Sequence, residues 1–258
     1  MLHYQTAGNS KNKVCLVLVH AWPLSSDMWK AQLEVLQKVA YVITPDISGL
    51  GKSPRQSTPN VPEIAQGVAA LLDHLGVKGP VVIGGLSMGG YVAFEFLRQF
   101  PTRVRGVCLL ATRANADTPE ARERRMKNIE FLQTHPLEEF LPRVIPNLLG
   151  PTTRAAHPYL EQEVKSLILQ NKAEGICDTL LAMAGRQDST DLLGKIPCPA
   201  LVMAGEEDGF VTTEESKAMH AKIPGAEFHL LKQTGHLLNL EQPEAFNVIL
   251  SSFLSKLL

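Results

Sequence analysis

Apolar and polar positions along the first half of the chain follow two different periods in turn. Four largely apolar segments predict strands: 14–19, 41–47, 80–86 and 104–111. The first is a continuous apolar run, which is typical of a strand buried on both faces. Between these segments, apolar positions spaced three and four residues apart predict three helices: 25–39, 60–75 and 88–100. Alternation of strands and helices is typical of a parallel sheet with right-handed crossovers, so we predict an α/β fold.

Polar residues mark where two of these helices begin. Asn60 precedes the second helix and Glu63 follows three residues later, which is the pattern of a helix N-cap. Ser25 and Ser26 stand before the first helix, and we expect them to cap it. The segment 48–59 is rich in Gly, Pro and Ser and predicts a loop.

The alternation of strands and helices stops after residue 112. From 113 to about 190 no strand is predicted, and the helical segments are separated by prolines: Pro136, Pro142, Pro146, Pro151 and Pro158. The alternation then resumes with four elements: a strand at 200–204, a helix at 213–223, a strand at 227–231 and an amphipathic helix from 243. We therefore predict one core domain built from residues 1–112 and 191–258, interrupted by a helical insertion at 113–190.

A G-x-S-x-G motif, Gly85-Leu-Ser87-Met-Gly89, lies between a predicted strand and a predicted helix. A sharp turn at that position holds a serine hydroxyl above the sheet, and the helix start offers backbone N–H groups to an oxyanion. Glycines on both sides leave room for the tight turn. We interpret Ser87 as a nucleophile.

A serine hydroxyl needs a base, and the base needs an acid that orients it. Of the eight histidines, His236 alone lies just after a late predicted strand, where this chemistry requires the base. Three consecutive acids, Glu206, Glu207 and Asp208, follow the strand at 200–204. The residues alone leave open which of the three orients the histidine.

Composition excludes several classes of partner and cofactor. With 25 Lys+Arg against 26 Asp+Glu, the net charge of −1 provides no basic face for nucleic acid or an anionic membrane. The apolar run at 14–19 is far shorter than the roughly twenty residues of a membrane span, and the N-terminus lacks a signal-peptide pattern. The four cysteines form no C-x-x-C pair, so no zinc site is indicated. We expect a cytoplasmic protein without metal or cofactor.

Five segments together resemble the α/β-hydrolase-fold serine hydrolases over essentially the whole chain: 20–25, 45–53, 85–90, 205–208 and 235–236. The most similar subgroup contains carboxylesterases, 3-oxoadipate enol-lactonases and cofactor-free haloperoxidases or perhydrolases. The resemblance implies a catalytic triad of Ser87, Asp208 and His236. It also implies an oxyanion hole formed by the backbone N–H groups of Trp22 and Met88.

By the same resemblance the insertion is a lid over an acyl pocket, and five side chains are candidates to line that pocket: Trp22, Phe131, Phe140, Ile145 and Met183. His20 would support the oxyanion loop. The expected activity is hydrolysis of small carboxylic esters or lactones, a small-molecule substrate, through an acyl-enzyme. The alternatives are perhydrolase or haloperoxidase activity, or a slow ligand-sensing signalling protein that keeps the triad; oligomeric state is left open.

One position departs from the family pattern. Ala21 stands where the family usually has glycine after His20. An alanine in the left-handed region costs about 1–2 kcal/mol. The loop is therefore either not left-handed here, or it aims its N–H donor differently, and the second reading favours the sensor alternative.

Overall fold

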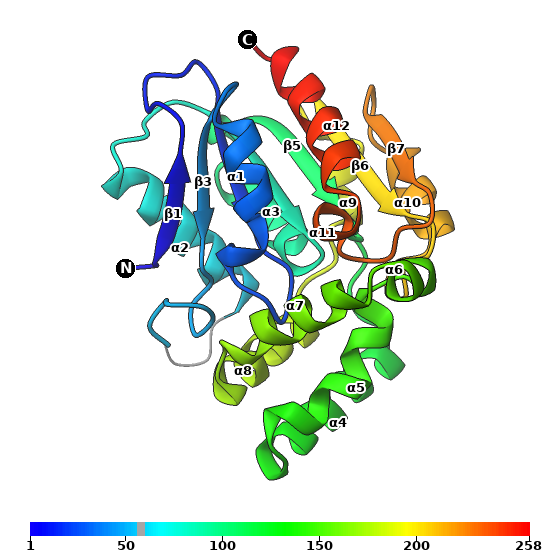
Figure 1. The fold of residues 1–258 in the computed structure, drawn as a ribbon. Coiled ribbons are helices and arrows are strands. Elements are labelled where there is room, and N and C mark those ends of the chain that lie inside the picture. The colour runs from blue at the N-terminus through cyan, green and yellow to red at the C-terminus, as the bar shows by residue number, and fades with distance from the viewer. Residues whose placement is uncertain (56–59) are drawn as a thin grey trace.

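The computed structural model describes residues 1–55 and 60–258, so residues 56–59 of the predicted loop lie outside its description. A seven-stranded sheet in the order β1-β3-β2-β4-β5-β6-β7 runs through the described chain (Figure 1). Its strands are β1 (Tyr4–Ala7), β2 (Cys15–Val19), β3 (Tyr41–Pro45), β4 (Val81–Leu86), β5 (Val104–Leu110), β6 (Ala200–Gly205) and β7 (Glu227–Leu231). Strand β1 pairs antiparallel with β3, whereas the other pairs are parallel.

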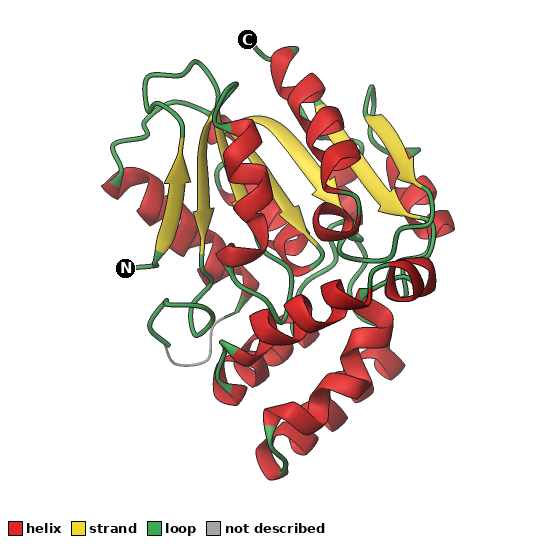
Figure 2. Ribbon diagram, viewed as in Figure 1, coloured by secondary structure: helices red, strands yellow, loops and turns green. Residues whose placement is uncertain are grey.

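Helices cover both faces of the sheet (Figure 2). α1 (Lys30–Leu36) packs against α12 (Pro243–Ser255) on one face, and α2 (Val61–His74) packs against α3 (Met88–Gln99) on the other. Three shorter helices accompany the last strands: α9 (Thr190–Leu193) precedes β6, α10 (Thr213–His220) lies between β6 and β7, and α11 (Leu238–Glu241) precedes α12. Two 3-10 turns also occur in the described chain: η1 (Ser26–Trp29) and η2 (Pro101–Arg103). The predicted parallel α/β architecture is confirmed.

The segment between β5 and β6 is helical, as the sequence predicts. It contains α4 (Pro119–Thr134), α5 (Leu137–Leu148), α6 (Pro151–Ala156), α7 (Pro158–Leu169) and α8 (Ala173–Ala184). These helices lie beyond the carboxyl ends of the parallel strands (Figure 1). The Ser189 N–H donates to the Ala114 carbonyl over 2.8 Å, so the insertion leaves and re-enters the core at one place.

The expectation that prolines separate the helices of this segment is wrong for two of them. Pro142 and Pro146 lie inside α5, whereas Pro151 and Pro158 begin helices. A proline has no N–H, so each internal proline leaves the carbonyl four residues earlier without a hydrogen-bond donor. These carbonyls are those of Glu138 and Pro142. Both of those residues are exposed, so water can satisfy the carbonyls while the opposite side of α5 is buried.

The expected serine cap of the first helix is also wrong. Ser25 makes no side-chain cap hydrogen bond, and the helical segment begins with the 3-10 turn η1, which precedes α1. Ser26 has tertiary partners instead, because its N–H donates to Asp46 over 2.7 Å and its hydroxyl accepts from Gln5 over 3.0 Å.

Strand β1, which contains Gln5, was not predicted because it has no apolar run. Its pairing with β3 makes it a strand.

The predicted cap of α2 is confirmed, because the Asn60 carboxamide oxygen accepts the Glu63 N–H over 2.8 Å. Replacing Asn60 with Ala leaves that N–H without its partner. We expect the free energy of unfolding to fall by about 1 kcal/mol. Urea denaturation measures this change. A difference below about 0.5 kcal/mol is typical of an ordinary surface substitution and would contradict a stabilising role for the cap.

Candidate active site

Ser87 occupies a strained turn between β4 and α3. Its φ of 57° and ψ of −110° lie in a region that costs a residue with a side chain about 1–3 kcal/mol. Hydrogen bonds on both sides hold the turn: the Ser87 N–H donates to Leu110 over 2.8 Å, and the Ser87 carbonyl accepts the Thr112 hydroxyl over 2.8 Å. The surrounding structure therefore enforces the sharp turn that the motif predicts, and Ser87 is half-buried there.

Backbone contacts explain why the glycines of the motif are required. A Cβ on Gly85 would lie 2.0 Å from the carbonyl carbon of Gly89, and a Cβ on Gly89 would lie 2.2 Å from the Val19 carbonyl oxygen. The first contact closes the turn. The second packs the start of α3 against the end of β2, directly before the loop that contains Trp22.

His236 and Asp208 form a buried pair in which each side chain is only 1% exposed. The His236 Nδ1 lies 2.9 and 2.8 Å from the two carboxylate oxygens of Asp208. The Phe210 and Val211 N–H groups also donate to Asp208, over 2.7 and 3.0 Å. A carboxylate acceptor assigns the imidazole proton to Nδ1, which leaves Nε2 as a base.

The three consecutive acids that the sequence could not separate have different partners. Glu206 accepts the Gln233 N–H over 3.0 Å, and Glu207 accepts the Thr152 N–H over 3.0 Å. Asp208 is the acid that bonds to the histidine. The first two acids therefore stabilise loops, and their carboxylates are already engaged.

Ser87, Asp208 and His236 follow the carboxyl ends of β4, β6 and β7, at one edge of the sheet. Within the described chain, neither the Ser87 hydroxyl nor the His236 Nε2 has a protein hydrogen-bond partner, so no serine–histidine bond is made in this structure. Such bonds are often long in ligand-free enzymes and tighten when substrate binds.

The loop after β2 is held by His20, which is completely buried. Its Nδ1 donates to the Ala21 carbonyl over 3.0 Å, and its Nε2 accepts the Ile47 N–H over 3.0 Å. Burial lowers the pKa of His20, while the Ala21 carbonyl and Asp46 oppose the shift. A neutral ring suits this arrangement of one donor and one acceptor, and it supports the loop as expected.

The φ angle of Ala21 is not positive. Among the described residues other than glycine, only Ser87, Ala111 and Gln233 have positive φ. Two explanations were open for alanine at a position where the family usually has glycine. The structure shows the first: the loop is not left-handed at Ala21. In the described structure, the backbone N–H groups of Trp22 and Met88 donate to no protein acceptor.

The family profile described as alpha/beta hydrolase fold matches residues 14–243. The chain belongs to the α/β hydrolase fold family. A 3-oxoadipate enol-lactonase from Acinetobacter baylyi is 27% identical over 95% of this chain and 90% of its own. A thermophilic esterase from Thermogutta terrifontis, whose structure has malate bound, is 38% identical with a TM-score of 0.95, over 99% of this chain and 93% of its own.

In this α/β hydrolase, three of the predicted pocket residues lie together. The Trp22 indole N–H donates to Ile176 of α8 over 3.3 Å, and its ring meets Phe140 of α5 edge-on at 6.0 Å. Phe140 in turn lies 6.3 Å from Phe131 of α4. Trp22 therefore joins the loop after β2 to the helical insertion.

The remaining predicted pocket residues, Ile145 and Met183, are each 2% exposed. The Met183 sulfur accepts a hydrogen bond from Arg125 over 3.5 Å. The ring of Phe131 is stacked on His135 at 4.1 Å and covered by Arg143 at 3.9 Å. These contacts are side-chain packing within the insertion and show no role in binding substrate.

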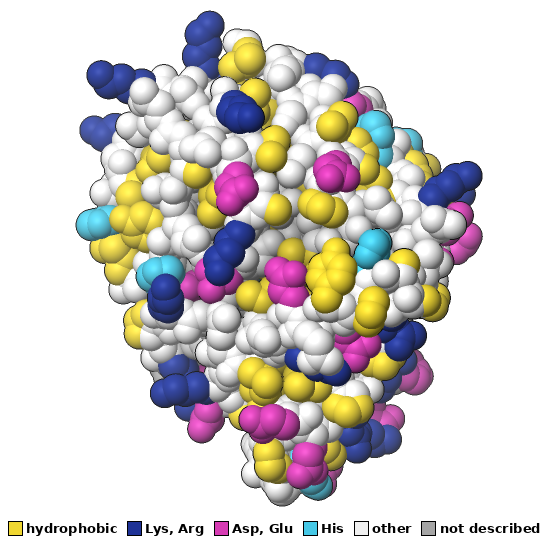
Figure 3. All heavy atoms as spheres, in the orientation of Figure 1, with side chains coloured by type: hydrophobic (Ala, Val, Ile, Leu, Met, Phe, Trp, Pro, Cys, Tyr) yellow, Lys and Arg dark blue, Asp and Glu magenta, His cyan; other side chains and the backbone are white. Residues whose placement is uncertain are grey.

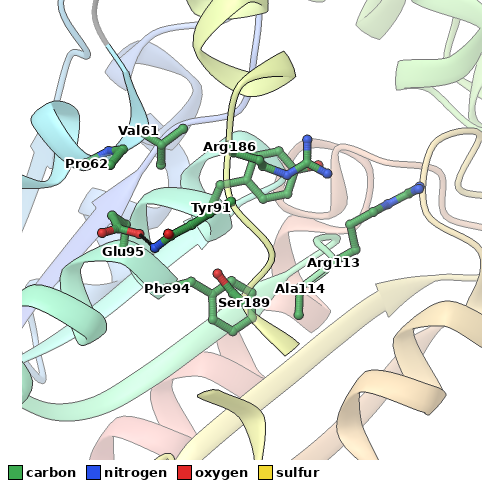
Figure 4. A pocket seen from close by; sticks show the side chains of 10 residues that line it. Val61, Pro62, Tyr91, Phe94, Glu95, Arg113, Ala114, Arg186 and Ser189 are labelled. Carbon is green, nitrogen blue, oxygen red and sulfur yellow. Dashed lines mark hydrogen bonds between the residues drawn. The ribbon is translucent and has the colours of Figure 1, made fainter. Parts of the chain in front are cut away.

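A cavity near α3 is too small for a substrate (Figure 4). It is lined by Tyr91, Arg113 and Arg186 among others, and its volume of about 10 Å³ holds about one water molecule. On the face shown in Figure 3, acidic and basic side chains are interspersed. Among the described residues, no group of three His, Cys, Asp or Glu is placed to hold a metal, and no helix has the length and apolarity to cross a bilayer.

Two residues beside His236 were not predicted from the sequence. The Phe210 ring meets the imidazole edge-on at 4.9 Å. Glu241 is only 6% exposed, and its carboxylate accepts the N–H groups of Gly150 and Gly235 over 3.0 and 2.8 Å. Burial raises the pKa of Glu241, and hydrogen bonds from the Thr153 side chain and from these backbone N–H groups oppose the shift. The signal in the sequence was an acid directly after three leucines, Leu237, Leu238 and Leu240.

The conformation of Ala21 predicts the effect of restoring the family glycine. Because Ala21 is not left-handed and its methyl group is fully buried, Ala21→Gly relieves no strain. We expect unchanged kcat and a free energy of unfolding lower by about 0.4–1 kcal/mol. Steady-state kinetics and urea denaturation measure both, and a clear rise in kcat would show that alanine impairs the loop.

Proposed function

We propose that this α/β hydrolase cleaves small carboxylic esters or lactones by nucleophilic catalysis, with Ser87 as nucleophile, His236 as base and Asp208 as the acid that orients the base. The observation that carries the proposal is the His236–Asp208 pair, which leaves Nε2 as a base at the same sheet edge as the strained Ser87 turn. Nucleophile, base and orienting acid are the three groups that acyl transfer requires.

In the proposed reaction, the Ser87 oxygen bonds to the carbonyl carbon of the substrate while its proton passes to His236 Nε2. The carbon–oxygen bond to the leaving group then breaks, and the leaving oxygen takes that proton. Water attacks the acyl-enzyme, giving its proton to Nε2, and the proton returns to Ser87 as the acid product departs. In a lactone the leaving oxygen stays attached to the acyl group.

The backbone N–H groups of Trp22 and Met88 are the proposed oxyanion donors. Met88 is the first residue of α3, where helical N–H groups have no partner within the helix. Neither of these two donors has a protein acceptor in the described structure, so both remain available. One such donor is typically worth about 10²–10³ in turnover.

The substrate class rests on the relatives and on the neutral overall charge. Named relatives include an enol-lactonase and an esterase, both of which act on carboxylic ester bonds. A net charge of −1 gives no strong field to select a highly charged substrate. We assign the insertion at 113–190 as the lid and the Trp22–Phe140 contact as part of the acyl wall.

The slow-turnover sensor loses the support that sequence provided for it. That support was an oxyanion loop disturbed by a left-handed Ala21, and Ala21 does not have a positive φ. We also propose a cytoplasmic location, because all four cysteines are free thiols. Burial raises the pKa of Cys15 to about 12 and of Cys198 to about 11, which keeps both thiols protonated and unreactive at neutral pH.

The proposal is tested with p-nitrophenyl esters from acetate to octanoate. We expect multiple turnovers by the wild type, and a loss in Ser87→Ala of at least about 10³-fold, because the attacking oxygen is gone. Hydrolysis that survives in Ser87→Ala would remove Ser87 from the mechanism. A wild type that stops after a single turnover would indicate the sensor instead, and the preferred chain length measures the acyl pocket.

The role of the acid is tested by comparing Asp208→Asn with Glu206→Gln. The amide at 208 favours the wrong imidazole tautomer, so we expect kcat to fall by about 10³–10⁴-fold. Glu206 is exposed and accepts one loop N–H, which a Gln oxygen can also accept. Its variant should keep kcat within about twofold; similar losses in both variants would contradict a specific role for Asp208.

A further inference from the structure

The backbone around His236 is held by a buried carboxylate that the proposed mechanism does not use. The N–H groups of Gly235 and Leu237, on either side of the histidine, donate to the Glu241 oxygens Oε2 and Oε1 over 2.8 and 3.1 Å. The N–H groups of His236 and Leu237 donate to the Leu148 carbonyl, each over 3.2 Å. All three consecutive donors of this loop therefore end on Glu241 or on Leu148.

Glu241 also joins this loop to the helical insertion. Its Oε2 accepts a second N–H, that of Gly150, over 3.0 Å, where the chain turns from α5 into α6. The turn and the loop touch backbone to backbone, because a Cβ on Gly235 would lie 2.1 Å from the Gly150 nitrogen. One carboxylate thus fixes the distance between the α5–α6 turn and the loop that carries His236.

We propose that Glu241 is a positioning residue for His236: by clamping residues 235, 237 and 150 it sets where the imidazole lies relative to Asp208 and Ser87. This inference rests on the proposed function, in which His236 is the base. It implies that the α5–α6 turn is part of the support of the base, so the insertion does more than cover the pocket.

The chemistry of the carboxylate makes the proposal specific. Oε2 accepts two backbone N–H groups and Oε1 accepts one, so both oxygens must be acceptors. A glutamine has the same shape but a single oxygen. Whichever way its amide turns, at least one backbone N–H faces an NH₂ group, and the loop must shift.

The test compares Glu241→Gln with Glu244→Gln, an exposed glutamate three residues away. We expect Glu241→Gln to lower kcat for p-nitrophenyl butyrate by about 10–10²-fold with KM within about twofold, because small displacements of a catalytic group cost turnover. The NMR signal of the His236 Nδ1–H proton, assigned by its loss in His236→Ala, should shift or broaden. Glu244→Gln should match the wild type in both measurements.

A wild-type kcat in Glu241→Gln would overturn the proposal. A lower kcat with an unchanged Nδ1–H signal would also overturn it, as would a fall in kcat that only matches the loss of folded protein. If Glu241→Gln does not fold, Glu241→Asp, which draws the carboxylate back by one methylene, is judged by the same two readouts. The NMR signal does not depend on hydrolysis, so it tests the position of His236 even if Ser87→Ala shows the proposed function to be wrong.

Discussion

The candidate site depends on backbone packed directly against backbone at the carboxyl edge of the sheet. A Cβ on Gly205 would lie 2.1 Å from the Gly235 carbonyl oxygen, just as the Gly85–Gly89 contact admits no side chain. The first contact holds the loops after β6 and β7 together, where the acid and the histidine lie, and the second closes the serine turn after β4. The strain at Ser87 persists because this packing leaves the turn no room to relax.

Two of the contacts that attach the helical insertion to that edge lie beside the candidate site. Its α5–α6 turn is bound to the loops of Asp208 and His236, through Glu207 and Glu241. Near α8, the Asn171 side chain donates to Pro23 over 2.9 Å and accepts the Gly51 N–H over 2.6 Å. One attachment therefore supports the proposed base, and the other supports the proposed oxyanion loop.

Much of the architecture was predictable because it follows from local pattern. Buried parallel strands leave continuous apolar runs, and the six parallel strands were predicted within a few residues of their observed bounds. Strand β1 was not, because its residues gain their strand conformation from pairing with β3. The prediction that prolines end the helix at α5 was wrong for a similar reason. Exposed carbonyls and a buried opposite face outweigh the local tendency of proline to break a helix.

The amino-acid sequence by itself determined the α/β class, the sharp turn at Ser87 and the position of His236 after the last strand, since each is written within a few neighbouring residues. Only the tertiary structure decided which of three adjacent acids meets the histidine, that Ala21 is not left-handed, and that Glu241 binds the loop around His236. Asp208 meets a histidine 28 residues away, and Glu241 accepts the Gly150 N–H of the α5–α6 turn from 91 residues away. A carboxylate's partner is set by which segments fold against it, and no local pattern records that.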